Sequence, residues 1–151
     1  MLASSGAALA PDLAAKLEGL GGRVAVGYGL TETAPLLALN PPDGRKLGSV
    51  GRPVPGVEIR IDPSAAPEEA MGAGVPGREG EILARGPNVF SGYRNRPEES
   101  SKVFDEDGWF RTGDLGYFDD DGYLYVTGRA STLIVTPGGK NVQPEAVEGV
   151  T

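Results

Sequence analysis

The chain has 151 residues and a formal net charge of −7, and it contains neither cysteine nor histidine. Without cysteine there is no disulfide, thiolate nucleophile or thiolate metal site. Without histidine a Ser-His-Asp triad is impossible and zinc catalysis has little support. The acidic balance, with no basic block, argues against non-specific binding to nucleic acid or acidic membranes.

No stretch of the sequence approaches the roughly 18 apolar residues that a membrane-spanning helix needs. Residues 1–10 lack a positively charged start, and their apolar stretch is short and interrupted, so they are interpreted as mature sequence. We therefore expect a cytoplasmic protein without a transmembrane segment. Peripheral attachment to the inner face of the membrane stays open.

The first regular element predicted is a helix over 12–20 that follows a run of small residues. Its apolar residues Leu13, Leu17 and Leu20 fall on one face. Two glycines directly after Leu20 end the helix. The pattern predicts an amphipathic helix that packs through its leucines.

A short strand over 23–26 runs directly into a glycine-rich polar loop over 27–33, an arrangement that often handles phosphate. The Thr31 hydroxyl can hold a phosphate oxygen, and the Glu32 carboxylate can hold the Mg²⁺ that accompanies a nucleotide. Tyr28 offers a flat face to a base. A turn with Thr and Glu at a helix start is the alternative. The Rossmann fingerprint is excluded, because Glu32 stands where its third glycine belongs.

Short strands separated by turns fill the region 46–128. Strands are predicted over 57–61 and 79–85, a solvated loop over 62–78, and a short helix over 97–103. This spacing predicts a mainly antiparallel, barrel-like region.

A hairpin with polar side chains in notable places closes this region. Strands over 109–112 and 123–127 are joined by a turn at Asp121-Gly122. Asp114 follows a glycine at the end of the first strand, where a carboxylate could accept hydrogen bonds from the paired hydroxyls of a ribose. Arg129 closes the second strand and suits phosphate or ribose oxygens. The alternative is an Asp-capped turn and an exposed arginine.

The end of the chain predicts a second, smaller hairpin. Strands over 133–136 and 141–143 flank a turn at 137–140, and a helix starts at 144–145.

The order of the motifs is more specific than any one of them. The sequence resembles the adenylate-forming synthetases, the superfamily of acyl-CoA synthetases, firefly luciferase and peptide-synthetase adenylation domains. Six segments carry the resemblance, in the order SSGAAL, GYGLTET, GSVGRPVPGVEIRI, GEILARGPNVFSGYRNRPEES, DGWFRTGDLG and GYLYVTGRASTLIVTPGGKNVQPEAVE. The first and last resemble bacterial long-chain fatty acyl-CoA ligases most.

The resemblance implies nucleotide binding by nine residues, namely Ser5, Gly6, Ala7, Gly27, Tyr28, Gly29, Thr31, Asp114 and Arg129. Residues 5–7 would lie beside the adenine, although Ser5 stands where the family usually has glycine. Tyr28 would cover the base, and Gly29 would border the acyl pocket.

The reaction that the resemblance implies uses ATP, Mg²⁺, a carboxylic acid and CoA. The acid and ATP give an acyl-adenylate, and CoA then displaces AMP. Thr31 and Glu32 would be the catalytic residues, the first on a phosphate and the second as the Mg²⁺ ligand. Asp114 would bind the ribose, and Arg129 would contact the nucleotide at the domain junction.

The last part of the chain would serve movement between domains. Ser131 occupies the hinge position, where Asp or Lys is usual, and Gly138 and Gly139 match the turn that reaches the active site during thioester formation.

The implied fold is α+β: a helix–strand unit of the α/β part over 1–45, a β-rich barrel-like subdomain over 46–128, and the hinge and start of a small domain over 129–151. The family's phosphate loop and its late lysine are not found, so we expect a fragment that is inactive alone.

Residues 34–37, Ala-Pro-Leu-Leu, suggest an apolar wall that fits a fatty acid. Another adenylate former that acts on aryl acids, amino acids or a carrier protein remains open. So do a degenerate nucleotide-binding module and a plain β-rich interaction domain.

Overall fold

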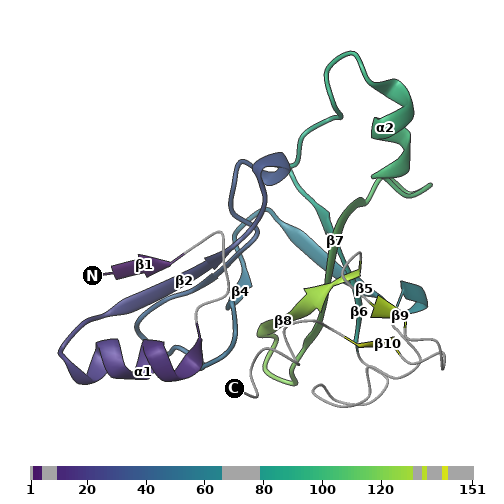
Figure 1. Cartoon of the computed structure of the whole chain (residues 1–151). Helices are drawn as coiled ribbons and strands as arrows, with labels where there is room; N and C mark the ends of the chain where they lie inside the picture. The colour runs from purple at the N-terminus through teal and green to yellow at the C-terminus, as the bar shows by residue number, and fades with distance from the viewer. Residues whose placement is uncertain (1, 5–9, 66–78, 131–133, 136–140, 143–151) are drawn as a thin grey trace.

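The computed structural model describes residues 2–4, 10–65, 79–130, 134–135 and 141–142. Two four-stranded sheets make up most of this part of the chain, and they meet at an angle (Figure 1). No helix among these residues is long and apolar enough to cross a membrane.

The first sheet has the strand order β1-β2-β3-β4. Its members are β1 (Leu2–Ser4), β2 (Val24–Tyr28), β3 (Ala38–Asn40) and β4 (Arg52–Pro53). β1 and β2 are parallel and the other pairs are antiparallel. Parallel neighbours need a crossover connection, and α1 (Pro11–Gly19) supplies it alongside the sheet (Figure 1).

Helix α1 agrees with the predicted bounds to within one residue at each end, but of the three leucines predicted to form its apolar face only Leu17 is partly buried. Leu13 is 47% exposed and Leu20 is 86% exposed, while Ala14 is buried. Leu20 lies at the C-cap, beyond the last helical residue, so the helical periodicity does not reach it. The helix therefore turns the small side chain of Ala14 inward.

The second sheet has the order β5-β6-β7-β8 and is antiparallel throughout. Its members are β5 (Glu58–Asp62), β6 (Gly80–Arg85), β7 (Phe110–Phe118) and β8 (Leu124–Arg129). β5 and β8 form opposite edges, so the described strands make an open sheet instead of the predicted barrel-like one. The predicted hairpin at Asp121-Gly122 is confirmed, with β7 longer than expected.

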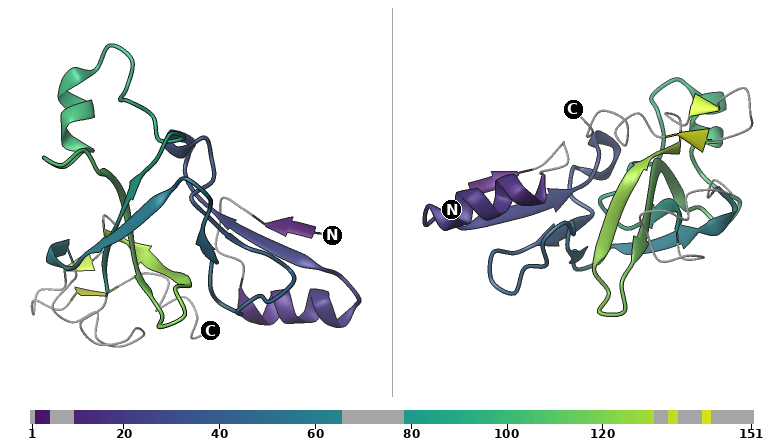
Figure 2. Two further views of the ribbon diagram at one scale, coloured as in Figure 1. Left: turned by 180° about the vertical axis from the view of Figure 1, so that it is seen from behind. Right: turned by 60° about the horizontal axis from the view of Figure 1, so that its bottom comes forward.

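The two sheets share a core where β3 meets the second sheet. Ala38, Ile82 and Leu124 are fully buried there and form one apolar cluster. An isolated bridge joins Gly51 to Leu124, whose backbone N–H donates to the Gly51 carbonyl at 2.8 Å. The sheets are thereby fixed to one another, and the further views show them diverging from this junction (Figure 2).

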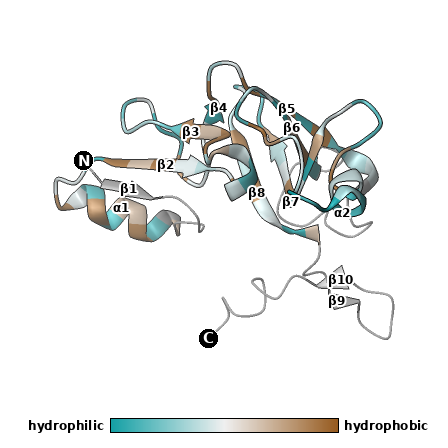
Figure 3. Cartoon of the chain, turned by 90° about the horizontal axis from the view of Figure 1, so that it is seen from above, coloured by the Kyte–Doolittle hydropathy of each residue, from teal (hydrophilic) through white to brown (hydrophobic). Residues whose placement is uncertain are grey.

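The remaining elements are short. They are α2 (Pro97–Lys102), the 3-10 turns Thr31–Thr33 and Pro63–Ala65, and the strands β9 (Ile134–Val135) and β10 (Asn141–Val142). β9 and β10 pair only with each other and stand apart from both sheets (Figure 3). The sequence predicted α2 and this ribbon but missed β3 and β4, which are too short to show an alternating pattern. The predicted helix start at 144–145 lies outside the described residues.

Candidate functional site

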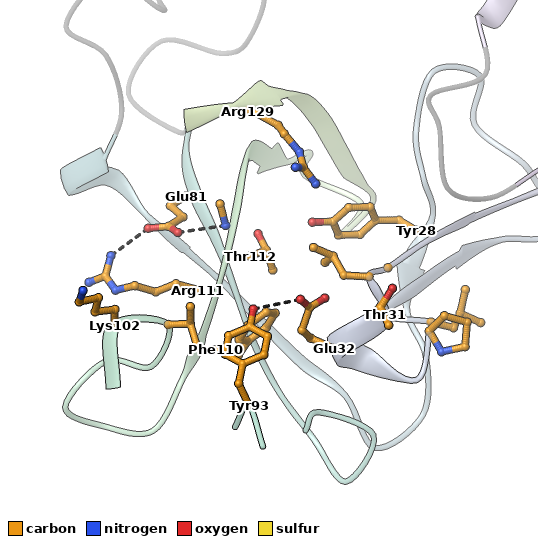
Figure 4. Close-up of a pocket in the computed structure, with 16 residues that line it drawn as sticks. Tyr28, Thr31, Glu32, Glu81, Tyr93, Lys102, Phe110, Arg111, Thr112 and Arg129 are labelled. Carbon is orange, nitrogen blue, oxygen red and sulfur yellow. Dashed lines mark hydrogen bonds and ion pairs between the residues drawn. The ribbon is translucent and has the colours of Figure 1, made fainter. Parts of the chain in front are cut away.

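An open cleft of about 920 Å³ lies between the end of β2 and the middle of β7. Tyr28, Thr31 and Glu32 line one side of it, and Arg111 and Arg129 line the other (Figure 4). The cleft therefore brings together segments that are about 80 to 100 residues apart in the sequence.

The buried side chain of Thr33 holds the loop that follows β2 by hydrogen bonds. Thr33 is fully buried, and its Oγ1 accepts from the Leu30 N–H at 2.9 Å. Asn88 Nδ2 donates to the Thr33 and Leu36 carbonyls, each at 2.8 Å. Because the backbone is held at these points, the side chains of Thr31 and Glu32 face the cleft. Thr33 and Asn88 could not be predicted as site residues, since residue type alone does not tell a buried polar side chain from an exposed one.

Gly29 is required by the way this loop folds back on itself. A Cβ at Gly29 would lie 1.7 Å from the Pro35 carbonyl oxygen. The prediction that residues 34–37 form an apolar wall of the cleft is correct for two of the four residues. Pro35 and Leu36 line the cleft, but Leu37 is buried in the interior and Ala34 is exposed, in the left-handed region at φ +47°.

Asp114 lies inside β7, not at the end of a strand as predicted. The register of β7 against β6 shifts here, so that residues 112–114 stand opposite Ile82 alone. Gly113 takes φ +73°, which glycine adopts without strain. Thr112 Oγ1 donates to the Ile82 carbonyl at 2.7 Å and accepts from the Asp114 N–H at 3.1 Å. A bulge of this kind re-aims a side chain, and here Asp114 turns inward.

The Asp114 carboxylate joins the two sides of the cleft. Tyr28 Oη donates to Oδ2 at 2.7 Å, and Arg129 Nε donates to Oδ1 at 3.0 Å. Asp114 is 6% exposed and is not among the residues that line the cleft, unlike Tyr28 and Arg129. The predicted convergence of the Tyr28 loop with Asp114 and Arg129 is thus present, although each carboxylate oxygen already carries one hydrogen bond.

Burial raises the pKa of the Tyr28 phenol above its ordinary value of 10.0, and the nearby Asp114 carboxylate raises it further. Above about pH 10 the unfolded chain therefore loses this proton before the folded chain does, so the free energy of unfolding falls as pH rises. Tyr28→Phe has no phenol to titrate, so we expect its free energy of unfolding to decrease less steeply with pH above pH 10. Urea unfolding at a series of alkaline pH values measures it, and a slope equal to that of the wild type would contradict the assignment.

Glu81 supports the bulge from the neighbouring strand. It is buried, and its Oε1 accepts from the Gly113 N–H at 3.2 Å. Its Oε2 accepts from Arg111 at 2.8 Å (Figure 4). Glu81 and Arg111 were not predicted as site residues, because their pairing depends on the shifted register.

Tyr93, Lys102 and Phe110 also line the cleft and were also missed. Tyr93 Oη donates to Glu32 Oε1 at 3.0 Å. Burial and the Glu32 carboxylate raise the pKa of Tyr93.

Glu32 is the acidic residue of the cleft that could ligate a metal ion brought by a nucleotide. No group of three or more potential metal-ligating side chains occurs among the described residues. Glu81 is engaged by Arg111, which leaves Glu32 as the carboxylate beside Thr31. Mg²⁺ bound to phosphates keeps several waters and needs only one or two protein carboxylates, and Glu32 meets that need.

The other predicted site residues are not part of the described cleft. Gly27 lies within β2, paired with Leu39, and does not line the cleft. Six more lie outside the described residues, namely Ser5, Gly6, Ala7, Ser131, Gly138 and Gly139.

Comparison with known proteins gives matches along nearly the whole chain. A family model described as AMP-binding enzyme matches residues 1–94. The probable CoA ligase CCL9 of Humulus lupulus is 45% identical over 97% of this chain, and the long-chain-fatty-acid–CoA ligase FadD15 of Mycobacterium bovis is 42% identical over 96%. O-succinylbenzoate coenzyme A synthetase of Bacillus subtilis, solved with ATP and magnesium, is 36% identical over 98% of the chain, with a TM-score of 0.79.

The chain spans only part of each of these proteins. It covers 27% of the Humulus protein, 22% of the Mycobacterium protein and 30% of the Bacillus structure.

Proposed function

The chain belongs to the AMP-binding enzyme family, within its acid–CoA ligases, and from that premise we propose that its cleft holds the AMP part of an acyl-adenylate. The single observation that carries the proposal is that Tyr28 and Arg129, which line the cleft, both donate to the carboxylate of Asp114. An aromatic face, a carboxylate and a guanidinium are the groups that a nucleoside monophosphate needs.

The ribose would be bound by Asp114. Each of its oxygens has a second lone pair besides the one used by Tyr28 or Arg129, so the two ribose hydroxyls could both donate to this carboxylate. The Arg129 side chain is largely exposed and would re-orient toward the nucleotide.

The phosphate would lie beside the anchored loop, where the Thr31 hydroxyl can donate to a phosphate oxygen. Mg²⁺ brought by ATP would neutralise charge that develops on the phosphates. Glu32 would ligate that ion from the cleft wall. The catalytic contribution of these residues is therefore to orient the phosphates and bind charge, for which no histidine or cysteine is needed.

For the acid we propose a fatty acid, preferably long-chain, with CoA as the acceptor. The Mycobacterium relative, described as a long-chain-fatty-acid–CoA ligase, and the apolar Pro35 and Leu36 on the cleft wall support this choice. The Bacillus synthetase, named for O-succinylbenzoate, is the competing precedent. With these substrates a cytoplasmic location is proposed as well.

Calorimetry of the purified chain with AMP tests the nucleotide proposal. We expect saturable one-to-one binding of AMP, with 2′-deoxyAMP bound about ten-fold more weakly through the loss of one hydrogen bond to a charged group. The absence of binding by a folded chain would overturn the proposal.

A turnover assay with ATP, Mg²⁺, palmitate and CoA tests the reaction separately. Because the chain covers less than a third of its relatives, we expect no release of AMP by this chain alone. Robust release would contradict that expectation, and replacing palmitate by O-succinylbenzoate in an active longer protein would discriminate between the two acids.

A further inference from the structure

We propose that Tyr93 is a positioning residue that orients the Glu32 carboxylate toward a divalent cation carried by the nucleotide. This inference rests on the proposed function, since it takes the cleft to be a site for a metal–nucleotide complex. Tyr93 lies 61 residues from Glu32 in the sequence, and nothing in the sequence motif containing Glu32 indicates the pair.

The hydrogen bond from Tyr93 occupies only one of the two carboxylate oxygens of Glu32. Tyr93 Oη donates to Oε1 at 3.0 Å, while Oε2 accepts no hydrogen bond from a described residue. Both side chains line the cleft, and their polar ends point toward each other (Figure 4). One oxygen is therefore tied to the protein and the other remains available to a cation.

Tyr93 is itself held firmly enough to act as a support. Its ring packs edge-on against Phe90, with centroids 4.9 Å apart and planes at 72°. Its backbone N–H donates to Ser100 Oγ at 2.8 Å. The Phe90 N–H in turn donates to the Glu32 carbonyl at 2.8 Å, so the turn carrying Tyr93 is bonded to both the backbone and the side chain of Glu32.

Tyr93 as a whole is 37% exposed, and the hydrogen bond from its hydroxyl to Glu32 lies at the surface. Its ring contact with Phe90 survives the loss of the hydroxyl. The phenol oxygen thus adds little to packing, and its effect falls on the direction of the Glu32 carboxylate. Partners that orient a metal ligand typically change metal affinity by about ten-fold to a hundred-fold when they are removed.

The test compares metal-free ATP with Mn²⁺–ATP as probes, using calorimetry on the whole chain. For each protein, the Kd for metal-free ATP divided by the Kd for Mn²⁺–ATP measures how much the cation contributes to binding. In Tyr93→Phe we expect this ratio to fall by about ten-fold, with the Kd for metal-free ATP unchanged. In Glu32→Gln the contribution of the cation should be lost altogether.

Tyr123→Phe is the matched control. Its hydroxyl donates to the Gly44 carbonyl at 3.0 Å, and Tyr123 does not line the cleft. Removing this hydroxyl should leave both Kd values as in the wild type. Urea unfolding of each variant verifies that binding is measured on folded protein.

Each outcome decides between the inference and the proposed function. An unchanged ratio in Tyr93→Phe, or equal weakening of both probes, overturns the positioning role while AMP binding stands. If the wild type binds AMP but its ratio of Kd values is one, the cation contributes nothing to binding. Glu32 is then not a metal ligand, and the inference is overturned. A folded wild type that binds neither AMP nor ATP overturns the proposed function as well.

Discussion

Asp114→Ala is expected to weaken AMP binding by at least about 100-fold. The carboxylate would accept hydrogen bonds from two ribose hydroxyls, and a hydrogen bond to a charged group contributes about 1.5 to 3 kcal/mol. Its removal also takes away the acceptor to which the Tyr28 hydroxyl donates and one hydrogen-bond acceptor of Arg129.

A direct contact with the ribose can be separated from a loss of structure by changing the ligand together with the protein. Wild-type chain should lose about ten-fold in affinity between AMP and 2′-deoxyAMP. In Asp114→Ala the two ligands should bind equally, because the acceptor of the missing hydroxyl is gone. Asp114→Asn is the matched control for shape, since its amide offers one acceptor instead of two.

Two results would contradict this prediction. One is a Kd of Asp114→Ala for AMP equal to that of the wild type. The other is a variant that still discriminates AMP from 2′-deoxyAMP, which would place the ribose elsewhere. Loss of a buried partner costs about 1 to 3 kcal/mol of stability, so the binding is measured where urea unfolding shows the variant to be folded.

The local motifs were predictable because their chemistry depends on neighbours in the sequence. The proline at the start of α2, with acidic residues in its first turn, fixed that helix almost to the residue. The turn at Asp121-Gly122 likewise fixed the hairpin that ends at Arg129. The residues Tyr28, Thr31 and Glu32 were identified by their place after a strand, and the structure has all three on the cleft.

The bulge in β7 was not predictable from the sequence. Alternation along 110–118 gives no sign of where two additional residues enter the strand, and the placement of Asp114 depends on that point. The pairing of Glu81 with Arg111 depends on the same register. The exposure of Leu13 and Leu20 depends on how α1 lies against the sheet, which helical periodicity alone does not decide.

Gly51→Ala is expected to lower the free energy of unfolding by more than about 4 kcal/mol, a range reached only when something specific breaks. Gly51 has φ +97°, and a Cβ there would lie 1.9 Å from the Leu39 carbonyl oxygen and 2.2 Å from the Asn40 nitrogen. Both are backbone atoms, so no side-chain rotation relieves the overlap. Gly51 also bridges to Leu124, and the displacement therefore separates the two sheets.

Gly44→Ala isolates the cost of the backbone conformation alone. Gly44 has φ +76°, but no atom lies within 4 Å of a Cβ built on it. A residue with a Cβ in the left-handed region costs about 1 to 2 kcal/mol. Subtracting this from the Gly51→Ala value leaves the contribution of close packing at the junction. The single tryptophan, Trp109, is buried directly before β7 and reports unfolding by fluorescence.

The junction also couples stability to the site. Tyr28 and Ala38 are paired across β2 and β3, and Ala38 belongs to the core shared with Leu124. If the sheets separate, Tyr28 moves away from Asp114, and AMP affinity should fall in Gly51→Ala but not in Gly44→Ala. Equal losses of stability in the two variants would show that close packing at Gly51 does not hold the sheets together. The contact between Tyr28 and Asp114 would then depend on other parts of the structure.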